Sequence, residues 1–134
     1  MKIETVLMVD DDPAIRRIAD LSLTRVGKWK VLLAESGAQA LELAGQTKPD
    51  VILMDVMMPQ MDGPTTVQRL HQEFNLVETP VIFMTAKVMR QEMEAYEQYG
   101  AAGVIKKPFD PLTLPRTIQD IVNGGIYRIT ENAG

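Results

Sequence analysis

The stretch that decides the fold is Val51-Ile52-Leu53-Met54-Asp55, four apolar residues followed by an aspartate. A short run made only of apolar side chains is typical of a strand that is buried on both faces of a sheet. A carboxylate at the mouth of such a strand is costly unless another group pairs with it or uses it. Asp55 is therefore the first candidate functional residue.

Three further apolar runs also end in polar side chains. They are residues 6–9 before Asp10 and Asp11, residues 81–84 before Thr85, and residues 103–105 before Lys106 and Lys107. The carboxyl ends of parallel strands lie at the same edge of a sheet, and ligands of open parallel sheets bind there. Acids, a hydroxyl and an amine are therefore expected to converge with Asp55 on one site.

Helical patterns separate the apolar runs, and residues 31–34 add one more expected strand. The expected helix starts are Asp12, Ser36, Asp62 and Thr113, which is preferred over Asp110 because of Pro115. Met89, Met93 and Tyr96 are expected along one face of the fourth helix, which Gly100 ends. Five strands that alternate with five helices predict an α/β protein whose open parallel sheet is covered by helices on both faces.

The first helix carries an apolar stripe made of Ala14, Ile18 and Leu21. Because these residues recur at helical spacing, the stripe is expected to face the core. Gly27 is expected to end the helix, since glycine commonly follows the last helical turn.

Composition limits the class of protein. The chain has 134 residues, 46% of them hydrophobic, which suits one domain with one core. Its net charge is −4 with no long basic run, so direct DNA binding is not expected. It has no cysteine, which excludes disulfides and thiolate metal sites. The sequence shows neither a signal peptide nor a long apolar span, so we expect a soluble cytoplasmic protein without membrane contacts.

The three acids Asp10, Asp11 and Asp55 would repel one another if all were ionised at one sheet edge. A hard cation relieves this repulsion, and carboxylates with a backbone carbonyl and waters are ligands that suit Mg²⁺. A site built from oxygen ligands, without histidine or cysteine, argues against zinc and copper. The acids therefore predict a magnesium site.

Thr85 and Lys107 would complete this site for a phosphoryl group. Lys107 can neutralise one phosphoryl oxygen as a point charge, and the Thr85 hydroxyl can donate a hydrogen bond to another. Positioning and charge neutralisation are most of what phosphoryl transfer requires. A carboxylate is normally ionised near neutral pH, so Asp55 can itself be the nucleophile and form an aspartyl phosphate.

With these residues in place, the chain resembles the receiver domain of two-component response regulators. The matching motifs are Val9-Asp10-Asp11, Asp55 with Met58-Pro59 and Asp62-Gly63, Thr85-Ala86, and Lys107-Pro108-Phe109. Each motif is weak alone, but their order and spacing are specific together. The match covers residues 4–123, and the size is similar to that of a stand-alone receiver of the bacterial chemotaxis type.

The resemblance implies a flavodoxin-like, doubly wound, five-stranded parallel sheet with strand order 2-1-3-4-5 and five helices. Residues 1–124 are then expected to form the receiver domain and residues 125–134 a C-terminal tail. Such a tail is too short for a DNA-binding output domain, so output is expected to pass through a downstream protein.

The resemblance also assigns roles to the site residues. Asp55 is the expected phosphoacceptor, and a sensor histidine kinase or phosphotransfer protein is the expected donor. The expected Mg²⁺ ligands are Asp10, Asp11, Asp55 and the backbone carbonyl of Met57. Thr85 and Lys107 are expected to contact the phosphoryl group, and the peptide bond between Lys107 and Pro108 is expected to be cis. The chain would catalyse only its own phosphorylation and dephosphorylation, so it is not expected to be an enzyme acting on other substrates.

The resemblance places the output surface on the fourth helix, the fifth strand and the last helix. Tyr99 and Arg116 are expected on this surface, with Tyr96 at its margin. A homodimer is a possible assembly. Val104 departs from the family, in which many members have an aromatic residue whose rotamer reports phosphorylation. Lys106 is expected to point away from the site, because neighbouring side chains of a strand alternate.

Other functions are less consistent with the residues. A phosphatase of the haloacid dehalogenase type uses a second aspartate two residues after the nucleophile, where this chain has Met57. A flavodoxin-like flavin carrier has a phosphate loop after the first strand, where three aspartates would here repel the phosphate. A phosphate sink or shuttle without conformational output remains the alternative, and Val104 favours it.

Several residues near the motifs have simpler interpretations. Asp12 and Asp62 are expected to be helix caps, and His71 a surface residue. The methionines at 54, 57, 58 and 61 are expected to fill the core and loops rather than to bind copper. Met57 and Lys87 are expected to flank the phosphoryl pocket and to govern water access to it.

Overall fold

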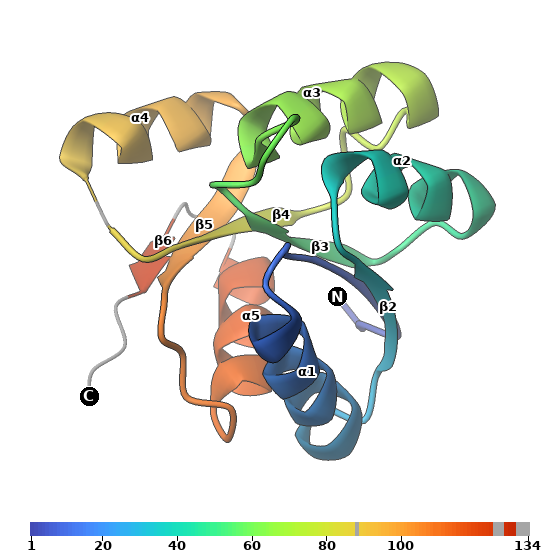
Figure 1. Cartoon of the computed structure of the whole chain (residues 1–134). Helices are drawn as coiled ribbons and strands as arrows, with labels where there is room; N and C mark the ends of the chain where they lie inside the picture. Colours follow the sequence, from blue (N-terminus) through green and yellow to red (C-terminus); the bar gives the residue numbers. More distant parts are fainter. Residues whose placement is uncertain (88, 125–127, 131–134) are drawn as a thin grey trace.

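Parallel strands form the centre of the computed structural model, which describes residues 1–87, 89–124 and 128–130. The strands are β1 (Thr5–Val9), β2 (Lys30–Ala34), β3 (Val51–Asp55), β4 (Val81–Thr85), β5 (Ala101–Lys106) and β6 (Arg128–Thr130). The helices are α1 (Pro13–Leu21), α2 (Gly37–Gln46), α3 (Gly63–Phe74), α4 (Arg90–Gln98) and α5 (Leu114–Gly124), with a π-helical turn η1 (Ser22–Val26) after α1. The strand order is β2-β1-β3-β4-β5-β6 (Figure 1).

The predicted strand order 2-1-3-4-5 and the five α-helices are confirmed within the described residues. The prediction of a five-stranded sheet was one strand short, because β6 pairs in parallel with β5 and places Ile129 beside Val104. This strand lies inside the segment predicted to be a tail. Three residues are too few to show a strand periodicity, so the pattern alone does not reveal β6.

Helices cover both faces of the sheet. In Figure 1, α2, α3 and α4 lie on one face and α1 and α5 on the other. Each face has its own buried cluster, one centred on residues such as Phe83 and Leu70 and the other on residues such as Ile82 and Ile118. All five residues of β3 and of β4 are buried, which explains why these strands read as continuous apolar runs.

The apolar stripe predicted for the first helix was wrong. Ile18 and Leu21 are 41% and 45% exposed, while Ala19 and Leu23 are completely buried. The helix carries two apolar stripes at helical spacing. The stripe that continues into η1 packs against the sheet. The predicted end of this helix at Gly27 is confirmed, because η1 stops at Val26.

The predicted caps are confirmed. The Asp12 carboxylate accepts a hydrogen bond from the N–H of Ala14, and the Asp62 carboxylate accepts one from Thr65. Ser36 caps α2 in the same way. α5 begins at Leu114, directly after the preferred start at Thr113. The caps at the starts of α1 and α3 lie close to Asp10 and Asp55, so they help to hold the loops that carry these acids.

No helix in the described part of the chain combines the length and the apolar character that a membrane crossing requires.

Gly63 is required by a close approach of two loops. A Cβ atom at this position would lie 2.4 Å from the backbone oxygen of Asp55. The Gly63 N–H also donates to the carbonyl of Val56 at 2.9 Å, so the loop after β3 and the start of α3 are joined directly.

We predict that Gly63→Ala lowers the free energy of unfolding by about 1–3 kcal/mol, because the backbone oxygen of Asp55 cannot move aside cheaply. Urea denaturation measures this loss. Gly45→Ala is the matched control, because its added Cβ would meet the ring of Phe74, a side chain that can shift. If the two variants lost equal stability, the close approach at Gly63 would not be the cause.

Candidate functional site

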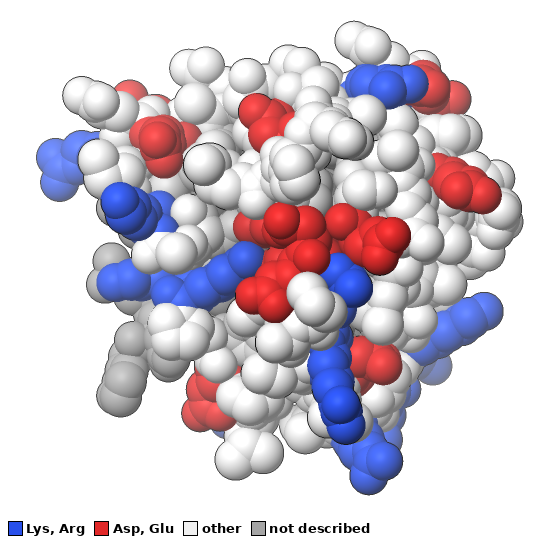
Figure 2. Space-filling model, viewed as in Figure 1, with Lys and Arg blue, Asp and Glu red and all other residues white. Residues whose placement is uncertain are grey.

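The polar residues that end the strands lie together at the carboxyl edge of the sheet. Asp10 directly follows β1, Asp55 is the last residue of β3, Thr85 ends β4, and Lys107 directly follows β5. Parallel strands bring these positions to one edge, as the sequence predicts. Figure 2 shows acidic side chains gathered in the middle of this face, with basic side chains on both sides of them.

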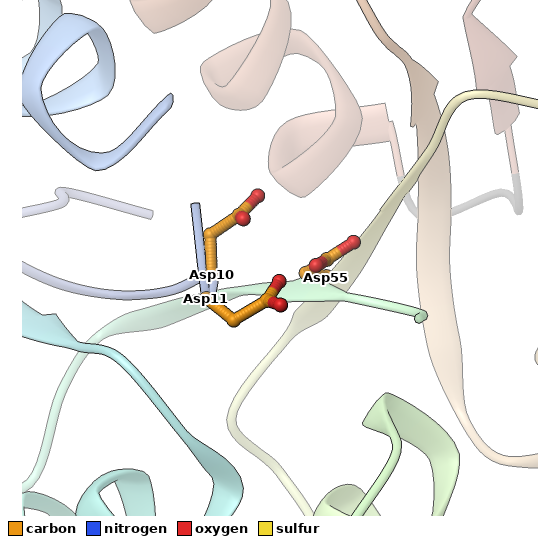
Figure 3. Close-up of side chains that lie close together, drawn as sticks. All are labelled: Asp10, Asp11 and Asp55. Atoms are coloured by element: carbon orange, nitrogen blue, oxygen red, sulfur yellow. The ribbon is translucent and has the colours of Figure 1, made fainter. Parts of the chain in front are cut away.

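Asp10, Asp11 and Asp55 form a carboxylate cluster. One oxygen from each lies within 4.8 Å of the others, and Figure 3 shows the three side chains around one space. Asp10 and Asp55 are buried, whereas Asp11 is exposed. Carboxylates at this spacing repel one another, and a bound hard divalent cation would offset the repulsion. The donor set therefore fits a hard divalent cation such as Mg²⁺.

Lys107 bridges two of these acids. Its Nζ atom lies 2.6 Å from Oδ2 of Asp10 and 3.0 Å from Oδ1 of Asp55. Burial lowers the pKa of Lys107, but its hydrogen bonds to both carboxylates and their charges outweigh burial, so its pKa is raised and it stays a cation. The expected cis peptide bond between Lys107 and Pro108 is confirmed.

Burial and the neighbouring charge of Asp10 raise the pKa of Asp55 to about 6, although Lys107 opposes this shift. A bound divalent cation would favour the ionised form and so act in the same direction as Lys107. A nucleophilic role requires the ionised form of Asp55. The Lys107 ammonium and a bound divalent cation would both favour this form.

The Thr85 hydroxyl is engaged in the loop that follows β4. It donates a hydrogen bond to the carbonyl of Lys87 at 3.0 Å and accepts one from the Lys87 N–H at 3.2 Å. A hydroxyl has one hydrogen to donate. If Thr85 donates to a bound anion instead, the Lys87 carbonyl loses this hydrogen bond.

Arg16 is a residue near the site that the sequence reasoning missed. Its Nη1 atom donates to the backbone carbonyl of Asp10 at 2.8 Å, and its Nη2 atom lies 3.8 Å from Glu35. Glu35 follows β2, so its place at the carboxyl edge of the sheet was a usable signal. Arg16 lies within α1, and only the path of that helix brings it back to the turn at Asp10 and Asp11.

A pocket of about 620 Å³ opens over the acids. Its lining consists of the cluster Asp10, Asp11 and Asp55 together with Val56, Met57, Thr85, Ala86, Lys87, Met89, Glu92, Tyr96 and Lys107. Met57 and Lys87 therefore flank the acids as predicted, whereas their role in water access stays a prediction. Of the two neighbouring lysines, Lys107 lines the pocket, which agrees with the expected alternation.

The remaining candidates divide between core and surface. Met54 and Met58 are buried in the core, which supports their interpretation as filler rather than copper ligands. His71 is half-buried, and burial lowers its pKa. Arg116 is exposed and Tyr99 half-buried, whereas Tyr96, expected at the margin of the output surface, is buried.

Comparison with known proteins agrees with the fold. The family model of the response regulator receiver domain matches residues 6–119, and the chain belongs to this family. Two-component signalling is the setting in which these domains act.

Several relatives have similar sequences or structures. The chemotaxis protein CheY4 of Vibrio cholerae superimposes with a TM-score of 0.83 at 32% identity, covering 90% of this chain and 99% of that one. Protein PilH of Pseudomonas aeruginosa is 34% identical over 89% of this chain and 98% of its own length. Response regulator Rre1 of Synechocystis is 31% identical over 88% of this chain and 51% of its own length. The chain thus spans about half the length of several curated relatives.

The raised pKa of Asp55 has a measurable consequence for stability. Because the folded-state pKa lies above the ordinary value of 3.8, the folded protein binds this proton more tightly than the unfolded chain does. The resulting stability is present below about pH 4 and is lost as the pH rises through about 6.

We predict that, in chelator at neutral pH, Asp55→Asn raises the free energy of unfolding by about 1–3 kcal/mol. Denaturation in urea measures the difference, and added Mg²⁺ should narrow it by offsetting the carboxylate charges. Asp120→Asn, an exposed site on α5, is the control. A less stable Asp55→Asn protein under metal-free conditions would contradict the prediction.

Proposed function

We propose that this chain is a response regulator receiver that accepts a phosphoryl group on Asp55 and passes the signal on by protein–protein contacts. The donor is the phosphohistidine of a sensor histidine kinase or phosphotransfer protein. The observation that carries this proposal is the placement of the Asp55 carboxylate, which shares one pocket with Asp10, Asp11, Thr85 and Lys107.

The transfer uses the side chains in the following way. An ionised oxygen of Asp55 forms a bond to phosphorus while the bond from phosphorus to the donor's imidazole nitrogen breaks, and that nitrogen keeps the electron pair. Lys107 neutralises negative charge on the transferred group, and Thr85 donates a hydrogen bond to it. Mg²⁺ held by Asp10, Asp11, Asp55 and the Met57 carbonyl would neutralise further phosphoryl charge. Hydrolysis of the aspartyl phosphate resets the protein, and the chain acts on no other substrate.

The output surface is the face of α4, β5 and α5 that includes Tyr99 and Arg116. A phosphate sink or shuttle is the alternative. It shares the phosphorylation chemistry and differs in having no conformational response, and the burial of the small Val104 side chain in the core is the observation that favours it.

Exposure to Mg²⁺ and acetyl phosphate is expected to add one labile phosphoryl group, measured by intact-mass spectrometry. The gain should disappear in chelator and in Asp55→Ala, because the nucleophile or the charge-neutralising cation is then missing. Asp120→Ala removes an exposed acid on α5 and should leave the gain intact. A stable gain of mass, or a gain that survives in Asp55→Ala, would place the modification elsewhere.

Lys107→Ala is expected to slow phosphorylation by acetyl phosphate at least about tenfold, because the transferred group loses its fixed cation. Lys106→Ala is the matched control, since it removes the neighbouring lysine outside the pocket lining. The time course of the mass gain measures both rates. Equal rates for the two variants would remove Lys107 from the transfer step.

A further inference from the structure

Glu92 and Tyr96 form a hydrogen-bonded pair on the α4 wall of the pocket. The Tyr96 hydroxyl donates to Oε2 of Glu92 at 3.4 Å, and both residues line the same pocket as Asp55 and Lys107. Neither residue has a role in the transfer chemistry described above. A hydroxyl–carboxylate distance of 3.4 Å is long, so this bond is weak and a modest change in the local field can break it.

The ring of Tyr96 supplies the aromatic part of this wall. Its side chain is 5% exposed, and its centroid lies 5.0 Å from that of Phe83. Phe83 pairs with Val104 across β4 and β5, and the three residues belong to one core cluster. The aromatic ring beside the pocket therefore comes from Tyr96 on α4, whereas β5 contributes the small aliphatic side chain of Val104.

Phosphorylation would change the charge next to this pair. The phosphoryl group carries close to two negative charges at neutral pH but replaces the single charge of the Asp55 carboxylate, so the site gains about one negative charge. Glu92 lines the same pocket with an exposed side chain, and the added charge repels its carboxylate across the pocket. The ionised form of Glu92 is therefore driven away from the space that the phosphoryl group occupies.

The backbone can follow this movement. Thr85 gives up its hydrogen bond to the Lys87 carbonyl when it donates to a phosphoryl oxygen. No side chain among the described residues caps α4 at Met89, so its first turn, which contains Glu92, lacks a side-chain cap. The loop after β4 and the start of α4 are thus loosened at the same time as Glu92 is repelled.

We propose that the Glu92–Tyr96 pair senses the phosphoryl charge and transmits it to α4. Repulsion turns the Glu92 carboxylate out of the pocket, and the Tyr96 hydroxyl is released from it. This inference rests on the proposed phosphorylation of Asp55. It assigns to an α4 tyrosine the reporting role that Val104 cannot perform.

The test is ¹⁹F NMR of the full chain labelled with 3-fluorotyrosine. The chain has three tyrosines, so Tyr96→Phe assigns one resonance and Tyr99→Phe another. Spectra are recorded before and after treatment with Mg²⁺ and acetyl phosphate, and intact mass measures the phosphorylated fraction of the same sample. The Tyr96 resonance is expected to shift on phosphorylation and to remain in place in Asp55→Asn.

Glu92→Gln separates charge sensing from a general rearrangement of the pocket. Glutamine keeps the size of the side chain but is not repelled by a phosphoryl group, so the Tyr96 shift should fall to less than half of its original value. Glu94→Gln is the matched control, because Glu94 is exposed on the same helix outside the pocket lining. The shift should be fully retained in this variant.

Three results would overturn the proposal. A fully phosphorylated protein whose Tyr96 resonance does not move would show that the pair does not respond. An undiminished shift in Glu92→Gln, or an equal reduction in Glu94→Gln, would show that the Glu92 charge is not the sensor. A sample that gains no phosphoryl mass would overturn the proposed function itself, and the mass measurement distinguishes that failure from the other two.

Discussion

The site depends on one interaction, the contact of the Lys107 ammonium with the carboxylates of Asp10 and Asp55. Two largely buried acids at the end of adjacent strands are unfavourable without a positive charge. Lys107 supplies that charge from β5 and so links three strands of the sheet at their carboxyl ends. Lys107 does not fully offset the negative charge, since the pKa of Asp55 is still raised to about 6. The carboxylate cluster can therefore hold a further cation.

The loop after β4 connects the edge of the sheet that carries the carboxylate cluster with α4. Thr85 closes this loop through two hydrogen bonds with Lys87, and the same residue lines the pocket over the acids. The hydroxyl has one hydrogen. If it donates to a phosphoryl oxygen, as proposed, it can no longer donate to the Lys87 carbonyl, so the loop loses that hydrogen bond. This competition gives the pocket a physical route to α4, where Glu92 and Tyr96 lie.

Much of the fold followed from local signals in the chain. Continuous apolar runs marked the central strands, and capping residues such as Asp12 and Asp62 marked helix starts. Other features had no local signal. The buried face of α1 was mispredicted because two apolar stripes compete there, and β6 is too short to show a period. Arg16 was missed because its contact with Asp10 depends on the path of the helix between them.

The sequence by itself determined which chemical groups end the strands, and parallel pairing then obliges Asp10, Asp55, Thr85 and Lys107 to meet at one edge. Strand ends are set by short-range patterns, so the composition of the site could be read directly. Only the tertiary structure decided how those groups are connected: the double contact of Lys107, the engagement of Thr85 with its loop, and the aromatic wall from α4. The contacts of Lys107 and the position of α4 depend on distances between side chains remote in the sequence, which packing sets and no local pattern encodes, while the Thr85–Lys87 hydrogen bonds depend on the conformation of the loop.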